Sequence, residues 1–176
     1  MQFVILGLLL AGPLSLYDVH KRFTAGISLF YRASFGSISR ALEQLVAQGW
    51  AEVEDAVESR RGKKLYSITP AGQEAWRGWM LGPLTGSDLE TTMLARVYLL
   101  GLLPHDRERR QVVQAIRARL SEDAADLATL ADELDARDVV AGLEDIYRFQ
   151  RATLDYGIRS HALARAWLDD LEAARS

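Results

Sequence analysis

The chain has 176 residues, of which 49% are hydrophobic and 26% charged, a balance typical of a soluble globular protein that excludes a disordered tail or a disulfide-stapled peptide. It contains no cysteine, which excludes disulfides, thiolate nucleophiles and sulfur-ligated metal sites. The net charge of -3 is unevenly spread, because residues 1–80 carry nine Lys and Arg against seven Asp and Glu, and residues 81–176 carry twelve against seventeen. We therefore expect the two halves to meet different partners.

The longest apolar run extends from Phe3 to Ala11. It is shorter than the about 20 residues that a membrane-spanning helix needs, and no basic residue precedes it as in a signal peptide. We expect a cytoplasmic chain with no membrane partner. The run stops at Gly12-Pro13 and predicts a short helix buried on all sides. A second short helix is predicted after Ser15, its N-cap, with an apolar stripe of Leu16, Val19 and Phe23.

Small residues open a predicted third helix at Ser34, Gly36 and Ser37, and Gly49 closes it. Its apolar positions are Ile38, Leu42 and Leu45. The opposite face presents Ser37, Arg40 and Gln44, side chains that can hydrogen-bond to a polar surface and have no use in a core.

Two strands, Ala51 to Asp55 and Lys64 to Ile68, are predicted to form a hairpin. Four basic residues surround Gly62 at its tip: Arg60, Arg61, Lys63 and Lys64. Alone, such a cluster is more often a solvated hairpin tip than a nucleic-acid contact, but the preceding helix with its polar face favours DNA binding. Thr69 and Pro70 then begin a fourth helix, as N-cap and first helical residue.

The stretch through Gly82-Pro83 and Thr85-Gly86 is the predicted boundary between a domain of residues 1–82 and one of residues 83–176. Beyond it, every element is predicted to be helical. A capping box at Ser87 to Glu90 opens a helix whose stripe is Leu89, Met93, Val97 and Leu100. Two long helices follow, one from Pro104 to about Leu134 and one from about Asp138 to Ala174, joined at Arg137.

The two long helices and the helix at Leu89 cannot all bury their apolar seams in a self-contained pair, which predicts a homodimer. A helical bundle within one chain is the alternative. The residues expected at the dimer interface are Leu120, Leu127, Leu134, Leu143, Leu154, Ile158, Trp167 and Leu168.

Three helices followed by a basic hairpin is the order of a winged helix-turn-helix, in which the third helix enters the major groove. The small residues from Ser34 to Ser37 would let the helix N-terminus approach a phosphate. Arg40 and Gln44 reach further and can pair with base edges, contacts worth about 1–3 kcal/mol of discrimination. The hairpin residues would contact phosphates and make binding depend on salt.

Several motifs of the first 80 residues carry a family resemblance. The opening FVILGLLLAGPLSLYDV has its tyrosine at Tyr17, the third helix carries Ser34, Gly36, Ser37, Ile38, Ala41 and Leu42, and the second strand and following turn carry Lys64, Tyr66, Thr69, Pro70 and Gly72. These residues resemble the winged helix of the PadR family of bacterial transcriptional regulators. The later run YGIRSHALARAWLDDLEAA is similar, more loosely, to the helical dimerisation domain of the larger PadR subgroup.

The resemblance implies repression more than activation, and release of DNA by a small-molecule effector, often an aromatic or a drug-like cation. The chain departs from the family at Ser39-Arg40, where a Tyr-Pro pair is usual, so a phosphate contact from that tyrosine is not carried over. The residues expected to contact DNA are Tyr17, Ser34, Gly36, Ser37, Ser39, Arg40, Gln44, Arg60, Arg61, Lys63 and Lys64.

Catalysis is not expected. His20, His105 and His161 lie on separate segments without metal spacing, and no phosphate-binding glycine loop, GxSxG elbow or paired-carboxylate pattern occurs. We expect no catalytic residue, no metal and no cofactor.

We therefore predict a mainly α protein, in which a winged helix-turn-helix of three helices and a β-hairpin wing is followed by a C-terminal antiparallel helical dimerisation domain. The predicted function is that of a homodimeric, sequence-specific regulator that binds a dyad-symmetric operator in double-stranded DNA. The alternative is a helical protein–protein interaction module whose winged helix does not bind DNA.

Overall fold

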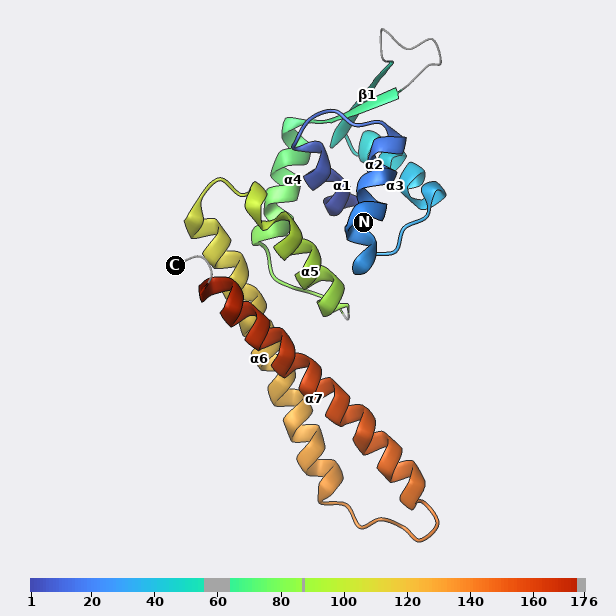
Figure 1. The fold of residues 1–176 in the computed structure, drawn as a ribbon, viewed down its shortest axis with the longest axis vertical. Helices are drawn as coiled ribbons and strands as arrows, with labels where there is room; N and C mark the ends of the chain where they lie inside the picture. Colours follow the sequence, from blue (N-terminus) through green and yellow to red (C-terminus); the bar gives the residue numbers. More distant parts are fainter. Residues whose placement is uncertain (56–63, 87, 174–176) are drawn as a thin grey trace. The chain divides into compact units, whose positions relative to one another are not determined.

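The computed structural model describes residues 1–55, 64–86 and 88–173 of the chain. It divides into two compact units, Met1–Val112 and Val113–Ser176, which are described separately (Figure 1). The order of elements confirms the predicted fold class: helices with a two-stranded hairpin come first, and two long antiparallel helices follow.

The first unit begins with three α-helices, α1 (Gln2–Leu9), α2 (Leu16–Ala25) and α3 (Phe35–Ala47), with a short 3-10 turn between the last two. Local hydrogen bonds fix where they start. The Ser15 hydroxyl accepts from the Asp18 amide, and the Asp18 carboxylate accepts from the Ser15 amide, which forms a capping box. The predicted N-cap at Ser15 is thus confirmed.

Helix α1 lies in the core of this unit. Six of its eight residues, Val4 to Leu9, are buried, as the apolar run predicts. It approaches α5 (Leu89–Leu99) closely, because a Cβ added to Gly7 would lie 2.8 Å from Leu99 Cδ1. A side chain at this position would require the end of the Leu99 side chain to move.

The hairpin consists of β1 (Ala51–Asp55) and β2 (Lys64–Ile68), paired antiparallel with Val53 opposite Tyr66. Both strands have the predicted bounds. A third segment joins them, since Leu14 and Tyr66 exchange two backbone hydrogen bonds of 3.0 and 2.9 Å. The base of the hairpin is therefore tied to the connection between α1 and α2. Helix α4 (Pro70–Leu81) follows, capped as predicted by the Thr69 hydroxyl.

The prediction for α5 is partly wrong. Its predicted cap Ser87 lies outside the described residues, and the Asp88 carboxylate caps the helix by accepting from the Thr91 amide at 3.3 Å. Of the predicted stripe, Met93 and Leu100 are buried, whereas Leu89 and Val97 are half-buried. The buried residues of α5 are instead Met93, Ala95, Arg96 and Leu99, and the charged Arg96 is 2% exposed.

Helix α6 (Asp106–Asp135) enters the second unit, where its residues from Val113 lie antiparallel to α7 (Glu144–Ala173) (Figure 1). The expected start of the last helix near Asp138 is wrong, and the connection includes the expected joint Arg137 but is longer than predicted. The connection runs over residues 136–143, and Gly142 has a φ of +89°, which favours glycine and interrupts a helix. Among the described residues, no helix is long and apolar enough to cross a membrane.

Ion pairs join α6 and α7 near both ends of the second unit. Arg117 pairs with Asp169 and, at 2.5 Å, with Glu172. Near the connection, Asp135 accepts hydrogen bonds from Arg151 Nε at 2.9 Å and from the Tyr147 hydroxyl at 3.0 Å. These contacts fix the register of the two helices.

Candidate nucleic-acid interface

The N-terminus of α3 is open to solvent and carries small residues. The Ser34 hydroxyl accepts from the Ser37 amide at 3.1 Å, so the predicted opening of this helix is confirmed. Ser34 and Gly36 are exposed, and Ser37 is half-buried. Because the backbone amides of a first helical turn carry partial positive charge, this end of α3 suits a phosphate.

The two faces of α3 differ sharply. Ile38, Leu42 and Leu45 are fully buried, while Arg40 and Gln44, one turn apart, are exposed on the other side. Within the described residues, Arg40 has no ion-pair partner, so its guanidinium is available to a ligand. Ser39 is half-buried and donates to the Glu43 carboxylate at 3.2 Å, which engages its hydroxyl within the helix.

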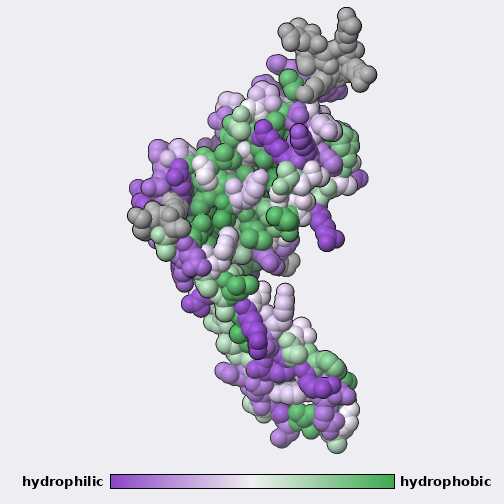
Figure 2. Space-filling view, in the orientation of Figure 1, coloured by the Kyte–Doolittle hydropathy of each residue, from purple (hydrophilic) through white to green (hydrophobic). Residues whose placement is uncertain are grey.

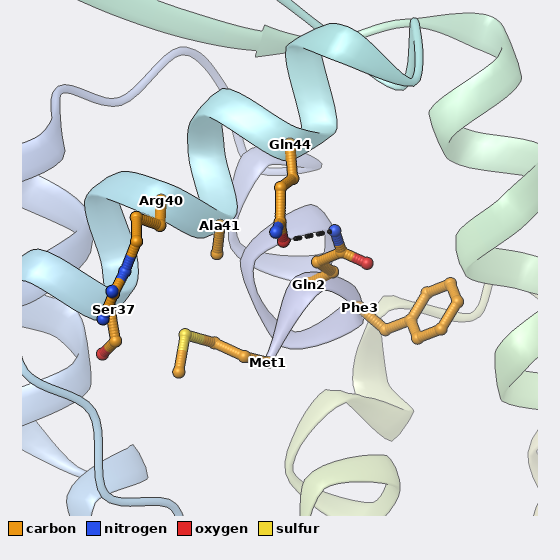
Figure 3. Close-up of a pocket in the computed structure, with 7 residues that line it drawn as sticks. All are labelled: Met1, Gln2, Phe3, Ser37, Arg40, Ala41 and Gln44. Atoms are coloured by element: carbon orange, nitrogen blue, oxygen red, sulfur yellow. Dashed lines mark hydrogen bonds between the residues drawn. The ribbon is translucent and has the colours of Figure 1, made fainter.

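The outer face of α3 and the start of α1 enclose an open pocket of about 540 Å³. Figure 3 shows the residues that line it: Met1, Gln2, Phe3, Ser37, Arg40, Ala41 and Gln44. Gln2 Nε2 donates to Gln44 Oε1 at 3.2 Å across this pocket. The pocket therefore brings Ser37, Arg40 and Gln44, three of the predicted site residues, to one surface.

The C-terminal end of α3 is held by a backbone hydrogen bond within its last turn and by a hydrogen bond from the N-cap of α4. Gly49 has a φ of +71°, and the next amide, that of Trp50, donates to the Leu45 carbonyl at 2.9 Å, which is a Schellman end. The Thr69 hydroxyl donates to the Gly49 carbonyl at 2.7 Å. A Cβ on Gly72 would lie 2.0 Å from the Trp50 carbonyl oxygen, so only glycine allows α4 to pack against this end.

The described part of the hairpin wing is its base, which consists of β1 and β2. Lys64 begins β2, is exposed and lies opposite Asp55, whereas the predicted residues Arg60, Arg61 and Lys63 lie outside the described residues. Burial raises the pKa of Tyr66, and the Glu43 carboxylate raises it further. An acidic side chain of α3 therefore lies near the base of the wing.

Tyr17, the remaining predicted DNA contact, is on the first turn of α2 and is 67% exposed. It is thus accessible to a partner.

Two polar residues of this unit, Gln2 and Arg96, form hydrogen bonds that were not predicted from the sequence. Gln2 precedes the predicted first helix, which was expected to begin at Phe3. Arg96 donates to the carbonyls of Gly82 and Pro83 at 2.7 and 3.0 Å, and its guanidinium lies 5.2 Å from the Trp79 ring centroid. Burial lowers the pKa of Arg96. The sequence contains a signal only for Arg96, because this is the single basic residue of α5 and lies among apolar residues.

The residues predicted for dimerisation lie at different depths within the single chain. Leu120, Leu154 and Leu168 are buried, Leu127, Leu134, Ile158 and Trp167 are half-buried, and Leu143 is exposed in the connection before α7. Their part in dimerisation stays a prediction.

Other apolar side chains of α7 are more accessible: Ile146, Phe149, Tyr156 and Leu163. The last three are spaced seven residues apart, so they share one face of the helix. Tyr156 and Leu163 are 75% and 72% exposed. Figure 2 shows hydrophobic residues among hydrophilic ones on the visible face of this unit, near its loop end.

Two protein-family models match this chain, one towards each end. Residues 5–77 match the model of the transcriptional regulator PadR-like family, and residues 91–175 match the model described as virulence activator alpha C-term. Together with the winged helix-turn-helix, these matches define a DNA-binding regulator of transcription. The chain belongs to the PadR-like family of transcriptional regulators, with a C-terminal region of the virulence activator type. Because the family is not enzymatic, the prediction of a non-enzyme is confirmed.

Among curated proteins, the negative transcriptional regulator PadR of Bacillus subtilis (strain 168) is 28% identical over 82 residues, 46% of this chain. The match spans 45% of the length of that relative. Among solved structures, B. subtilis PadR with operator DNA is 21% identical over 98% of this chain and 96% of that one, with a TM-score of 0.44. A PadR-like regulator from Bacillus cereus is 28% identical, covers 98% of both chains and has a TM-score of 0.42.

Proposed function

We propose that this chain is a sequence-specific, homodimeric repressor that acts on the chromosome in the cytoplasm and leaves its operator when a small-molecule effector binds. The observation that supports DNA reading is the outer face of α3, where Arg40 and Gln44 are exposed behind a small, serine-capped N-terminus. Such a helix admits base contacts from the side chains and phosphate contacts from the backbone. The exposed Lys64 supports a role of the wing on phosphates.

A dimer is supported by the apolar face of α7. Ile146, Phe149, Tyr156 and Leu163 are too large and too regularly spaced to be left in water without cost. A second copy of α7 offers a matching face about a two-fold axis. We propose that this face is the dimer seam, and that buried Leu154 and Leu168 serve it indirectly by holding α7 on α6.

We propose a functional boundary near residue 82, with residues 1–82 binding DNA and residues 83–176 serving dimerisation and the effector. The compact first unit extends to Val112, so α5 and the start of α6 would also support the DNA-binding helices. In this arrangement, an effector that displaces α5 also acts on the winged helix, because α5 packs directly on α1 at Gly7.

Selection of bound sequences from a random duplex pool tests the function. A dyad-symmetric consensus is expected from the full chain. No enrichment, together with no salt-dependent retention on random duplex, would refute DNA reading and favour a protein-binding winged helix.

The effector is tested on the selected operator. The first probe is p-coumaric acid, which the crystal structure of a B. subtilis PadR complex contains. Drug-like aromatic cations form the second set of probes. Release of the operator by a member of either set supports an effector, whereas unchanged affinity across both sets would refute release by these chemical classes.

A further inference from the structure

Gln2 and Gln44 are 42 residues apart in the chain, yet their side-chain amides meet. Gln2 is the first residue of α1 and half-buried, and Gln44 is exposed on the outer face of α3. The amino group of Met1 donates to the Tyr31 hydroxyl at 2.8 Å, which ties the start of α1 to the segment before α3. Gln2 is therefore held in a fixed place beside the face that carries Arg40 and Gln44.

The hydrogen bond has a direction that matters for base reading. Gln2 Nε2 donates and Gln44 Oε1 accepts, at 3.2 Å. Figure 3 shows the Gln44 nitrogen on the side of its amide away from Gln2. A free glutamine presents one acceptor and two donors, and it reads adenine by using both kinds of group at once. Here the oxygen faces another protein side chain, which leaves the amide nitrogen for a base.

We propose that Gln2 is a positioning residue for base reading, which holds the oxygen of Gln44 so that Gln44 meets DNA as a hydrogen-bond donor. This inference rests on the proposed function. The bases that fit a donor are guanine, through O6 and N7, and thymine, through O4. Cytosine directs only an amino group at the same place, and adenine directs one beside its single acceptor N7, so neither amino group would be matched by the Gln44 nitrogen.

The surroundings of Gln44 support a donor surface. Arg40, one turn away, offers only donors and has no ion-pair partner within the described residues. The acidic residue of this helix, Glu43, accepts from Ser39 instead. The outer face of α3 thus aims donors at its ligand from two successive turns.

Two substitutions at Gln2 separate this inference from a simple structural role. Gln2→Glu can only accept, so Gln44 must turn its nitrogen towards residue 2 and its oxygen towards DNA. Gln2→Lys can only donate, so Gln44 keeps its wild-type orientation. A carboxylate in the first turn of a helix is favourable, so Gln2→Glu should fold, and far-UV circular dichroism checks both variants.

The experiment compares base preferences of the full chain, carrying its purification tag at the carboxyl end, on operators found by selection and then substituted at each position. Wild type and Gln2→Lys should share one profile. Gln2→Glu should shift one symmetric pair of positions from guanine or thymine towards cytosine or adenine, by on the order of fivefold to tenfold, as for one hydrogen bond. The added charges change affinity for all sequences alike, so they do not alter the profile.

In a Gln44→Ala background, the two Gln2 variants should have identical profiles. If Gln2→Glu keeps the wild-type profile on an operator that is otherwise read with specificity, the inference is overturned and the proposed function stands. If the wild type enriches no sequence, the proposed function itself fails and the inference fails with it. A shift at Gln2→Glu that persists in the Gln44→Ala background would also overturn it, since Gln44 would not be the intermediary.

Discussion

Replacement of the buried Arg96 tests how the first unit is held together. Its guanidinium is 2% exposed, donates to two carbonyls after α4 and lies over the Trp79 ring. It therefore joins α5 to the end of α4 at Gly82 and Pro83. Arg96→Met keeps most of the side-chain volume but removes all of the donors.

The expected loss of stability follows from these interactions. Hydrogen bonds to a charged group contribute about 1.5–3 kcal/mol each, and a cation over an aromatic ring contributes about 0.5–2 kcal/mol. Two effects offset them: the Gly82 and Pro83 residues are partly exposed, so water can replace the donors, and the variant no longer buries a cation. We expect Arg96→Met to lower the free energy of unfolding by about 2 kcal/mol, and Arg96→Ala, which also leaves a cavity, by about 4 kcal/mol.

Urea unfolding of the full chain, followed by far-UV circular dichroism, measures these differences. Arg96→Lys retains a cation with fewer donors and should fall between wild type and Arg96→Met. Arg110→Met removes an exposed arginine of the same unit and should change stability by less than about 0.5 kcal/mol. An Arg96→Met protein at least as stable as wild type would refute the reasoning, because the cost of burying the cation would then equal or exceed the value of its hydrogen bonds and ring interaction.

Four further predictions concern the DNA surface and the helical unit. Changing Lys63 and Lys64 to Ala should weaken binding to all duplexes alike and reduce the slope of log affinity against log salt by ~0.9 for each phosphate that is no longer neutralised; an unchanged slope in fluorescence anisotropy would exclude a role of these lysines on the DNA backbone. Arg40→Ala should relax one symmetric pair of operator positions by ~1–3 kcal/mol, whereas an unaltered position-by-position profile would leave Arg40 as a phosphate contact or a surface charge. The double change Phe149→Glu and Tyr156→Glu should yield monomers in sedimentation, while the same charges at Ala162 and Ala166, on another exposed part of α7, should leave a dimer; equal behaviour of both pairs would refute the seam. The Arg151 hydrogen bond, assisted by Tyr147, lowers the pKa of Asp135 from its ordinary value, so the stabilisation by this carboxylate is present above the ordinary pKa and is lost as the pH falls through the lower pKa of the folded state. Asp135→Asn should therefore weaken the helical pair at neutral pH but not in strong acid, as amide hydrogen exchange would detect, and an equal loss at both pH values would contradict this.

The parts of the fold that depend on neighbouring residues could be predicted from sequence. Ser15, Ser34 and Thr69 each cap a helix through an amide three residues further on, so a short pattern contains the whole interaction. The strands could be predicted because their alternation is equally local. The core positions of α3 followed from helical spacing alone.

The parts that could not be predicted depend on distant residues. Nothing near Arg96 in sequence indicates that Trp79 and the end of α4 will enclose it. The apolar residues of α7 fall on more than one face, and spacing does not say which face meets α6 and which stays exposed. Gln2 and Gln44 meet only because the first turn of α1 packs beside α3.

The two hydrogen bonds between Leu14 and Tyr66 have a consequence for how such regulators diversify. They hold the base of the hairpin against the connection between α1 and α2, and they do not involve the residues that connect Asp55 to Lys64. Insertions or exchanges in that connecting stretch can therefore accumulate without displacing α3. Under the proposed function, mutations in the connecting stretch would change the general affinity for the DNA backbone, while α3 would keep the choice of operator. A chimaera that takes its connecting stretch from a relative should keep the parent's consensus and acquire the donor's salt sensitivity.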